Sequence, residues 1–136
     1  MIRKLLPLCL VAVLSGCYLM PYQMTAQQAA ALDDSQLITA CGPEDPNGLK
    51  KKREMREPAV AEAVRRGLIR KSMADEVLNG YAVVGMTKNE ARASWGTPRD
   101  INSTTSATFN QEQWCYGEYG GNYLYFSGGR LQTIQN

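Results

Sequence analysis

The sequence contains no histidine, the side chain used most often as a general base and as a metal ligand. It also lacks a glycine-rich phosphate loop and a nucleophile elbow. With catalytic candidates missing, we predict that the protein is not an enzyme and carries no cofactor. Cys41 and Cys115 alone are too few ligands for a structural zinc site, so we expect no metal.

A strong excess of one charge is missing as well. The chain has 15 Lys and Arg residues against 13 Asp and Glu residues. Arg3 and Lys4 belong to the N-terminal segment interpreted below as a signal peptide, and without them the two signs balance. Nucleic-acid-binding domains usually carry a clear basic excess. We therefore expect no nucleic-acid partner.

Long apolar runs are also missing, since the main one extends only from Leu5 to Leu14. A helix of that length reaches about 15 Å, about half of a ~30 Å hydrocarbon core. The run follows basic Arg3 and Lys4 and precedes small Ser15 and Gly16. This layout is typical of a secretory signal. We predict that residues 1–16 are a lipoprotein signal peptide.

The signal ends at a cysteine, Cys17. The segment Leu14-Ser15-Gly16-Cys17 resembles the bacterial lipobox, which implies that Cys17 is acylated and becomes the first mature residue. The alternative is an ordinary secretory signal cleaved elsewhere, with Cys17 left as a free thiol. Several acyl chains anchor a protein stably in a membrane. Because Tyr18 is not the Asp that retains lipoproteins in the inner membrane, we expect an outer-membrane anchor facing the periplasm.

Two of the four cysteines remain after lipidation and signal removal, namely Cys41 and Cys115. In an oxidising compartment, two such thiols favour a disulfide. The bond would close a long loop and contribute about 4 kcal/mol. The alternative, two reduced thiols that never meet, stays open.

The mature chain divides into three predicted segments. Residues 17–33 are expected to form the lipidated N-terminus and a tether, and residues 34–80 a helical extension. Residues 81–136 are expected to form an α+β domain. The predicted starts of the helices in the extension are Asp34 or Ser35, Pro58 and Ser72.

The α+β domain has the clearest local signals. Thr87 and Glu90 form a capping box for a helix that ends at Gly96. Beyond Pro98 the spacing of apolar residues changes from the helical period to the two-residue period of strands, with short turn-forming connections between the strands. We predict short helices packed on one face of a small antiparallel β-meander of three or four strands. The four predicted strands are Ile101–Thr105, Gln111–Tyr116, Asn122–Phe126 and Arg130–Ile134.

Aromatic residues are concentrated in two of these strands. Alternation places Leu124 and Phe126 toward the helices, and Tyr123 and Tyr125 on the opposite face. Trp114 is expected in the core. Tyr123 and Tyr125 are candidates for binding a partner, because Tyr dominates many interface hot spots. They could equally stabilise the sheet through cross-strand contacts.

A basic stretch runs from Lys50 to Lys71 and contains nine Lys and Arg residues. Near a membrane anchor it could contact anionic lipid head groups. The alternative is a solvated helix face with salt bridges, and we favour this one.

Several motifs occur in an order that resembles the SmpA/OmlA family of small outer-membrane lipoproteins. They span about residues 83–135 and are Gly85-Met86-Thr87 with Glu90, Trp95-Gly96-Thr97-Pro98, Glu112 to Tyr116, Tyr123 to Phe126, and Gly129-Arg130-Leu131. The family includes a subunit of the β-barrel assembly machinery. The resemblance implies helices on an antiparallel sheet and a non-catalytic protein-interaction module in envelope or outer-membrane protein assembly, with an envelope protein as partner. The alternative is an inhibitor or sensor that binds a periplasmic enzyme through the aromatic sheet face.

Overall fold

The computed structural model describes residues 23–45, 47–117 and 121–136. The predicted signal peptide and Cys17 lie outside the described residues. The helices are α1 (Ala26–Ala31), α2 (Asp34–Cys41), α3 (Arg53–Arg65), α4 (Ala74–Asn79) and α5 (Lys88–Trp95), with a 3₁₀ turn at Lys71–Met73. The strands are β1 (Asp100–Thr105), β2 (Asn110–Tyr116), β3 (Asn122–Ser127) and β4 (Arg130–Gln135).

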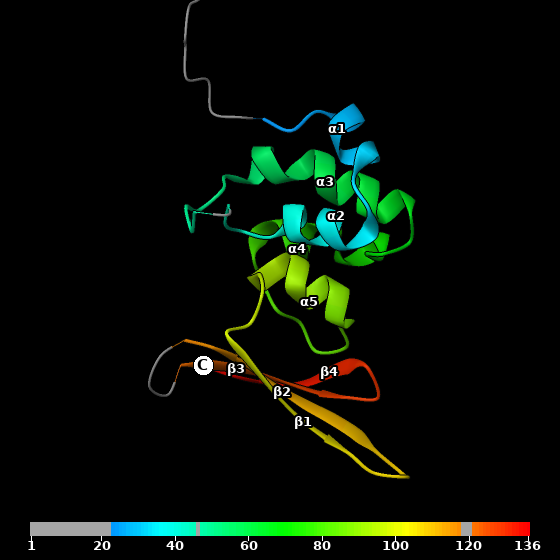
Figure 1. The fold of residues 1–136 in the computed structure, drawn as a ribbon, viewed down its shortest axis with the longest axis vertical. Helices are drawn as coiled ribbons and strands as arrows, with labels where there is room; N and C mark the ends of the chain where they lie inside the picture. Colours follow the sequence, from blue (N-terminus) through cyan, green and yellow to red (C-terminus); the bar gives the residue numbers. More distant parts are fainter. Residues whose placement is uncertain (1–22, 46, 118–120) are drawn as a thin grey trace, which may run out of the picture.

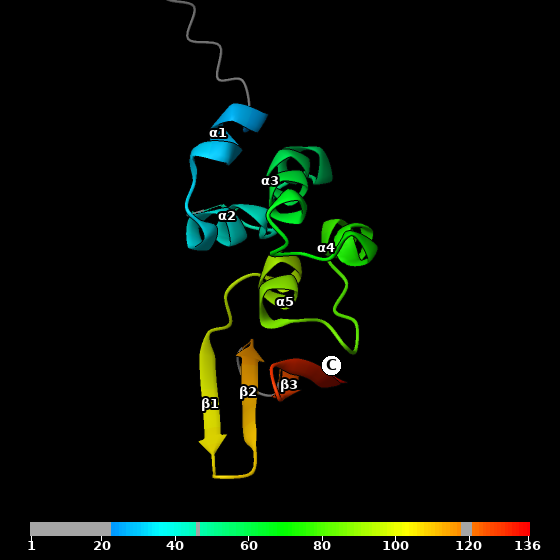
Figure 2. The ribbon, with the colours of Figure 1, turned by 90° about the vertical axis from the view of Figure 1, so that its right-hand side faces the viewer.

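The helices lie on one side of a four-stranded antiparallel sheet, and α5 lies between the other helices and the sheet (Figure 1). The strand order is β1-β2-β3-β4, so each strand pairs with its neighbour in sequence. The β1–β2 hairpin extends away from the helices (Figure 2). The predicted α+β fold with a β-meander is confirmed, and each strand begins and ends within one residue of its predicted bounds.

The two edges of the sheet differ. At the start of β4, Gly85 N–H donates to Leu131 O and Leu131 N–H donates to Met86 O, so residues 85–87 cover this edge. Among the described residues, β1 has only β2 as a strand neighbour. All six residues of β1 are exposed. The sheet therefore has one partly covered edge and one open edge.

Side-chain caps fix the starts of three helices. The predicted capping box of Thr87 and Glu90 begins α5. The same arrangement begins α1 at Thr25. Helix α2 starts at Asp34, but its capping residue is Asp33, directly before the two residues predicted for that role. In each case the side-chain oxygen accepts from a backbone N–H that the helix itself leaves unpaired.

Two predicted helix starts are wrong. Met73, not Ser72, precedes α4, and its side chain makes no cap. Pro58 lies inside α3, which begins at Arg53. An internal proline removes a backbone hydrogen bond and costs about 3 kcal/mol. Arg53 pairs with Asp75 over 2.9 Å and Arg56 donates to the carbonyl of Val77 over 2.7 Å, and these contacts with α4 stabilise the turn before Pro58.

One hydrophobic core joins the predicted extension and the predicted α+β domain. Leu37 and Val60 come from the extension, while Met86, Trp114 and Leu124 come from the later part of the chain. All five side chains are almost completely buried. Full burial of Trp114 confirms its predicted place in the core. Burying each large apolar side chain contributes about 2 kcal/mol, so the helices and the sheet stabilise one another.

The predicted disulfide is not formed, and Cys41 and Cys115 are both free. Cys41 is buried among the helices at the end of α2. Cys115 follows Trp114 in β2, so its side chain points to the sheet face away from the helices. The sulfur of Cys115 lies 3.8 Å from the side-chain nitrogen of Asn102 on that face. A bond would have to pass through the sheet, which explains why the two thiols stay apart.

Candidate binding face of the sheet

The sheet face that points away from the helices is the candidate functional site, and we call it the outer face. Trp114, Leu124 and Phe126 point to the helices and are buried, so their neighbours in β2 and β3 point outward. The register carries this alternation into β1 and β4. The side chains of the outer face are Asp100, Asn102, Thr104, Gln111, Gln113, Cys115, Tyr123, Tyr125, Ser127, Arg130, Thr133 and Gln135, with Gln132 at a bulge in β4.

The predicted binding residues Tyr123 and Tyr125 both lie on the outer face. Their side chains are half-buried, and their ring centroids are 6.4 Å apart with a tilt of 36°. Tyr125 lies opposite Gln113 on one side and Thr133 on the other. The prediction about which way these tyrosines point is confirmed, whereas their role in binding stays a prediction.

A chain of hydrogen bonds crosses all four strands on this face. Asn102 Nδ2 donates to Gln113 Oε1 over 3.1 Å, and Gln113 Nε2 donates to Tyr125 Oη over 3.0 Å. Tyr125 Oη then donates to Gln135 Oε1 over 2.9 Å. Each side chain thus restricts the rotamer of the next. The face presents amide and hydroxyl groups at fixed positions.

The outer face is almost free of charge. Of the charged residues in the four strands, Glu112 points to the helices and pairs with Lys88 over 2.6 Å. Arg130 donates to the carbonyl of Gly85 at the β4 edge. Asp100 lies at the end of β1 and pairs with Arg99. Each of these three charged groups therefore has a partner within the fold, although Glu112 also lines the depression described next.

A shallow depression of about 670 Å³ lies on the outer face. Asn102, Gln113, Tyr125 and Gln135, the four members of the hydrogen-bond chain, all line it. The depression is open to solvent, so it can hold an extended ligand lying on the sheet.

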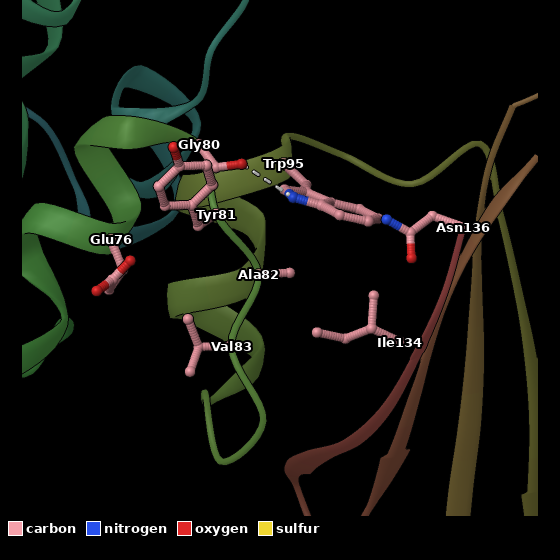
Figure 3. A pocket seen from close by; sticks show the side chains of 8 residues that line it. All are labelled: Glu76, Gly80, Tyr81, Ala82, Val83, Trp95, Ile134 and Asn136. Atoms are coloured by element: carbon pink, nitrogen blue, oxygen red, sulfur yellow. Dashed lines mark hydrogen bonds between the residues drawn. The ribbon is translucent and has the colours of Figure 1, made fainter.

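A second hollow, of about 510 Å³, lies where the segment before α5 faces β4 (Figure 3). Trp95 and Ile134 approach it from α5 and β4, and Tyr81 and Val83 from the segment between α4 and α5. The indole N–H of Trp95 donates to the carbonyl of Gly80 over 3.1 Å. This bond fixes the position of the Trp95 ring, which forms one wall of the hollow. The hollow lies on the helix side of the molecule, apart from the predicted binding tyrosines.

No family model, curated protein or solved structure matches this chain. The assignment of a site therefore depends on geometry and chemistry alone. In the described part of the chain, no group of three or more acidic or cysteine side chains is placed to hold a metal ion. Among residues 23–45, 47–117 and 121–136, no helix has the length and apolar character needed to cross a bilayer.

The basic stretch takes part mainly in internal contacts. Six of its nine side chains have partners within the fold, namely Lys51, Arg53, Arg56, Arg65, Arg66 and Arg70. Arg66, for example, donates to Glu62 and to the carbonyl of Leu32. The other three are Lys50, Lys52 and Lys71, all exposed. These contacts favour a structural role for the stretch, and contact with lipid head groups stays a prediction.

Arg56 is the structural residue that the sequence analysis missed. Its side chain is only 3% exposed, and its guanidinium donates to four carbonyls at the C-terminal ends of three other helices. These carbonyls belong to Cys41 in α2, Val77 and Leu78 in α4, and Ala93 in α5. A cation at helix C-termini also complements the helix dipole. Its partners are far away in sequence, so no local pattern indicates this role.

Glu90 connects α5 to the segment before α4 through an ion pair with Arg70. Its side chain is fully buried and accepts two hydrogen bonds from the Arg70 guanidinium, the shorter at 2.6 Å. It also accepts from the backbone N–H groups of Arg70 and Thr87. Burial alone would raise the pKa of Glu90, but these hydrogen bonds outweigh burial and hold the pKa below its usual value. The carboxylate is therefore a structural anion.

Proposed function

We propose that the protein is an outer-membrane-anchored periplasmic lipoprotein that acts as a non-catalytic binding module in envelope assembly or integrity. Acylation at Cys17 holds it at the membrane, and the outer face of the sheet binds the partner. The observation that supports this proposal best is the position of Tyr123 and Tyr125. Both lie on the face turned away from the helices, with Tyr125 inside a hydrogen-bond chain.

Tethering supplies the mechanism. A lipid anchor confines the domain to a surface and raises its effective concentration toward partners in the same envelope. Binding then requires only modest intrinsic affinity from the outer face. A half-buried pair of tyrosines loses little side-chain freedom on binding, which reduces the entropic cost.

Photo-crosslinking in cells tests the binding face. A photoreactive residue replaces Tyr123 on the outer face, and a matched control replaces Tyr81, which is 60% exposed on the other side of the molecule. We expect an envelope partner to be captured from position 123 and not from position 81. Equal capture from both positions, or capture from 81 alone, would contradict the assignment of the face.

Fractionation tests the anchor separately. The Cys17→Ser variant of the full chain cannot be acylated, so we expect it to leave the membrane fraction and appear in the soluble periplasmic fraction. Cys115→Ser is the matched control, because this thiol lies on the sheet and not at the predicted lipidation site. If Cys17→Ser stays with the membrane, the anchor hypothesis is wrong.

A further inference from the structure

The chemistry of the outer face distinguishes between kinds of partner. Protein interfaces are usually centred on aromatic, aliphatic, Met or Arg side chains that fill apolar pockets. The outer face contains two tyrosines and, at its ends, the charged residues Asp100 and Arg130, but no Leu, Ile, Val, Met or Trp. Its other side chains are amides, hydroxyls and the Cys115 thiol. This composition suits a polar ligand that has many hydrogen-bonding groups.

Unused hydrogen-bonding capacity lies on both sides of the depression. Within the described residues, Asn102 Oδ1 and Gln135 Nε2 have no partner, and they terminate the hydrogen-bond chain on β1 and β4. The hydroxyls of Thr104 and Thr133 are exposed nearby. The face thus offers donors and acceptors together. A ligand whose own groups both donate and accept, as sugar hydroxyls do, is complementary to it.

The pairing of the nearby charged groups restricts the ligand further. A phosphate-rich or carboxylate-rich ligand needs Lys or Arg side chains as partners, and a cationic ligand needs carboxylates. The charged groups near the depression already have partners within the fold, because Glu112, which also lines it, pairs with Lys88, Asp100 pairs with Arg99, and Arg130 donates to the carbonyl of Gly85. The face is therefore complementary to a neutral ligand.

The tyrosine rings add an apolar platform. The face of an aromatic ring carries partial negative charge, against which the polarised C–H groups of a sugar ring pack favourably. The rings of Tyr123 and Tyr125 lie 6.4 Å apart along β3, beside the amides of the hydrogen-bond chain. From these observations we infer that the outer face binds a neutral glycan chain. The inference rests on the proposed function and names the ligand of that same face.

Hydrogen bonding fixes the amides before the ligand arrives. Gln113 is held by Asn102 on one side and by Tyr125 on the other. Such preorganisation lowers the entropic cost of binding. The Tyr125 hydroxyl connects Gln113 to Gln135, so its removal leaves both amides free to rotate while the ring stays in place.

NMR titration of the full chain with maltohexaose and chitohexaose, two neutral oligosaccharides, tests the inference. Polygalacturonate serves as the anionic comparison. We expect the side-chain amide signals of Asn102, Gln113 and Gln135 to shift with at least one neutral oligosaccharide and not with polygalacturonate. Tyr125→Phe should weaken binding about tenfold, which corresponds to the loss of one hydrogen-bonded group. Tyr81→Phe, the matched control, should leave binding unchanged.

The inference is overturned if neither neutral oligosaccharide shifts these signals at about 10 mM, a concentration that detects even millimolar affinity. It is also overturned if Tyr125→Phe and Tyr81→Phe bind alike. If a protein is captured from position 123 but the amide signals do not shift, the proposed function stands and only the glycan inference is wrong. If the amide signals shift but Cys17→Ser stays in the membrane fraction, the glycan inference stands and the anchor hypothesis is wrong.

Discussion

At the scale of single residues, Arg56 carries much of the connection between helices. Its guanidinium contacts the ends of α2, α4 and α5 at once, with donor–acceptor distances of 2.7–3.1 Å. Burial lowers its pKa, but a guanidinium stays charged in proteins at neutral pH. Four carbonyls would therefore lose a charged donor if Arg56 were replaced.

Arg56→Met should lower the free energy of unfolding by about 3–5 kcal/mol, because buried carbonyls are left unpaired. Urea unfolding followed by circular dichroism measures the change. Lys52→Met, which removes an exposed cation from the same stretch, should cost less than about 0.5 kcal/mol. Equal effects of the two substitutions would show that charge, and not the buried hydrogen bonds, stabilises this region.

The two described cysteines should differ in reactivity. Burial raises the pKa of Cys41 to about 12, so at pH 8 this thiol is protonated as well as inaccessible. Iodoacetamide should modify Cys115 in the native protein and Cys41 only after unfolding, as read by peptide mass spectrometry. Rapid native labelling of Cys41, or a Cys41–Cys115 peptide pair under non-reducing conditions, would contradict the structure.

At the scale of elements, α5 depends on its capping box. The Thr87 hydroxyl accepts from Glu90 N–H over 3.2 Å, and the Glu90 carboxylate accepts from Thr87 N–H over 2.9 Å. Thr87→Ala removes the first bond and should cost about 1 kcal/mol of stability. Thermal unfolding measures this, with exposed Thr97→Ala as the control. If Thr87→Ala lowers stability less than Thr97→Ala does, α5 is held by packing alone and not by its cap.

Helices and strands that are specified by residues close together in sequence were predictable. The strands follow a period of two between turn-forming residues, and the α5 cap needs only residues 87–90. The start of α3 was not predictable, because contacts of Arg53 and Arg56 with α4 decide it and override the proline rule. Likewise, the directions of Tyr123 and Tyr125 follow from alternation, but the hydrogen-bond chain requires the register of four strands. Cysteine counting predicted a disulfide because it ignores which way each side chain points.

At the scale of the whole molecule, buried and paired carboxylates make stability depend on pH. Hydrogen bonds from Arg65 and then Arg66 lower the pKa of Glu62 from 4.5 to about 2. The pKa values of Glu90 and Glu112 are lowered too. A carboxylate with a lowered native pKa binds protons more weakly when folded, so its contribution is complete above about pH 4.5 and is lost as the pH falls toward 2.

Unfolding free energy measured between pH 7 and pH 2 should therefore stay nearly constant down to about pH 4.5 and then fall. Glu62→Gln should make the fall less steep, because one of the titrating groups is gone. Glu54→Gln, at an exposed position of the same helix, is the matched control and should leave the steepness unchanged. A profile that rises on acidification would show that these ion pairs do not stabilise the fold.

The unequal edges of the sheet set a limit on self-association. Strand β1 can accept the β1 strand of a second copy, and that pairing uses up the open edge of both molecules. Residues 85–87 cover the start of the opposite edge, so that edge offers a further copy a shorter strand than β1 does. At high protein concentration, pairing through β1 should therefore be favoured over extension into fibrils.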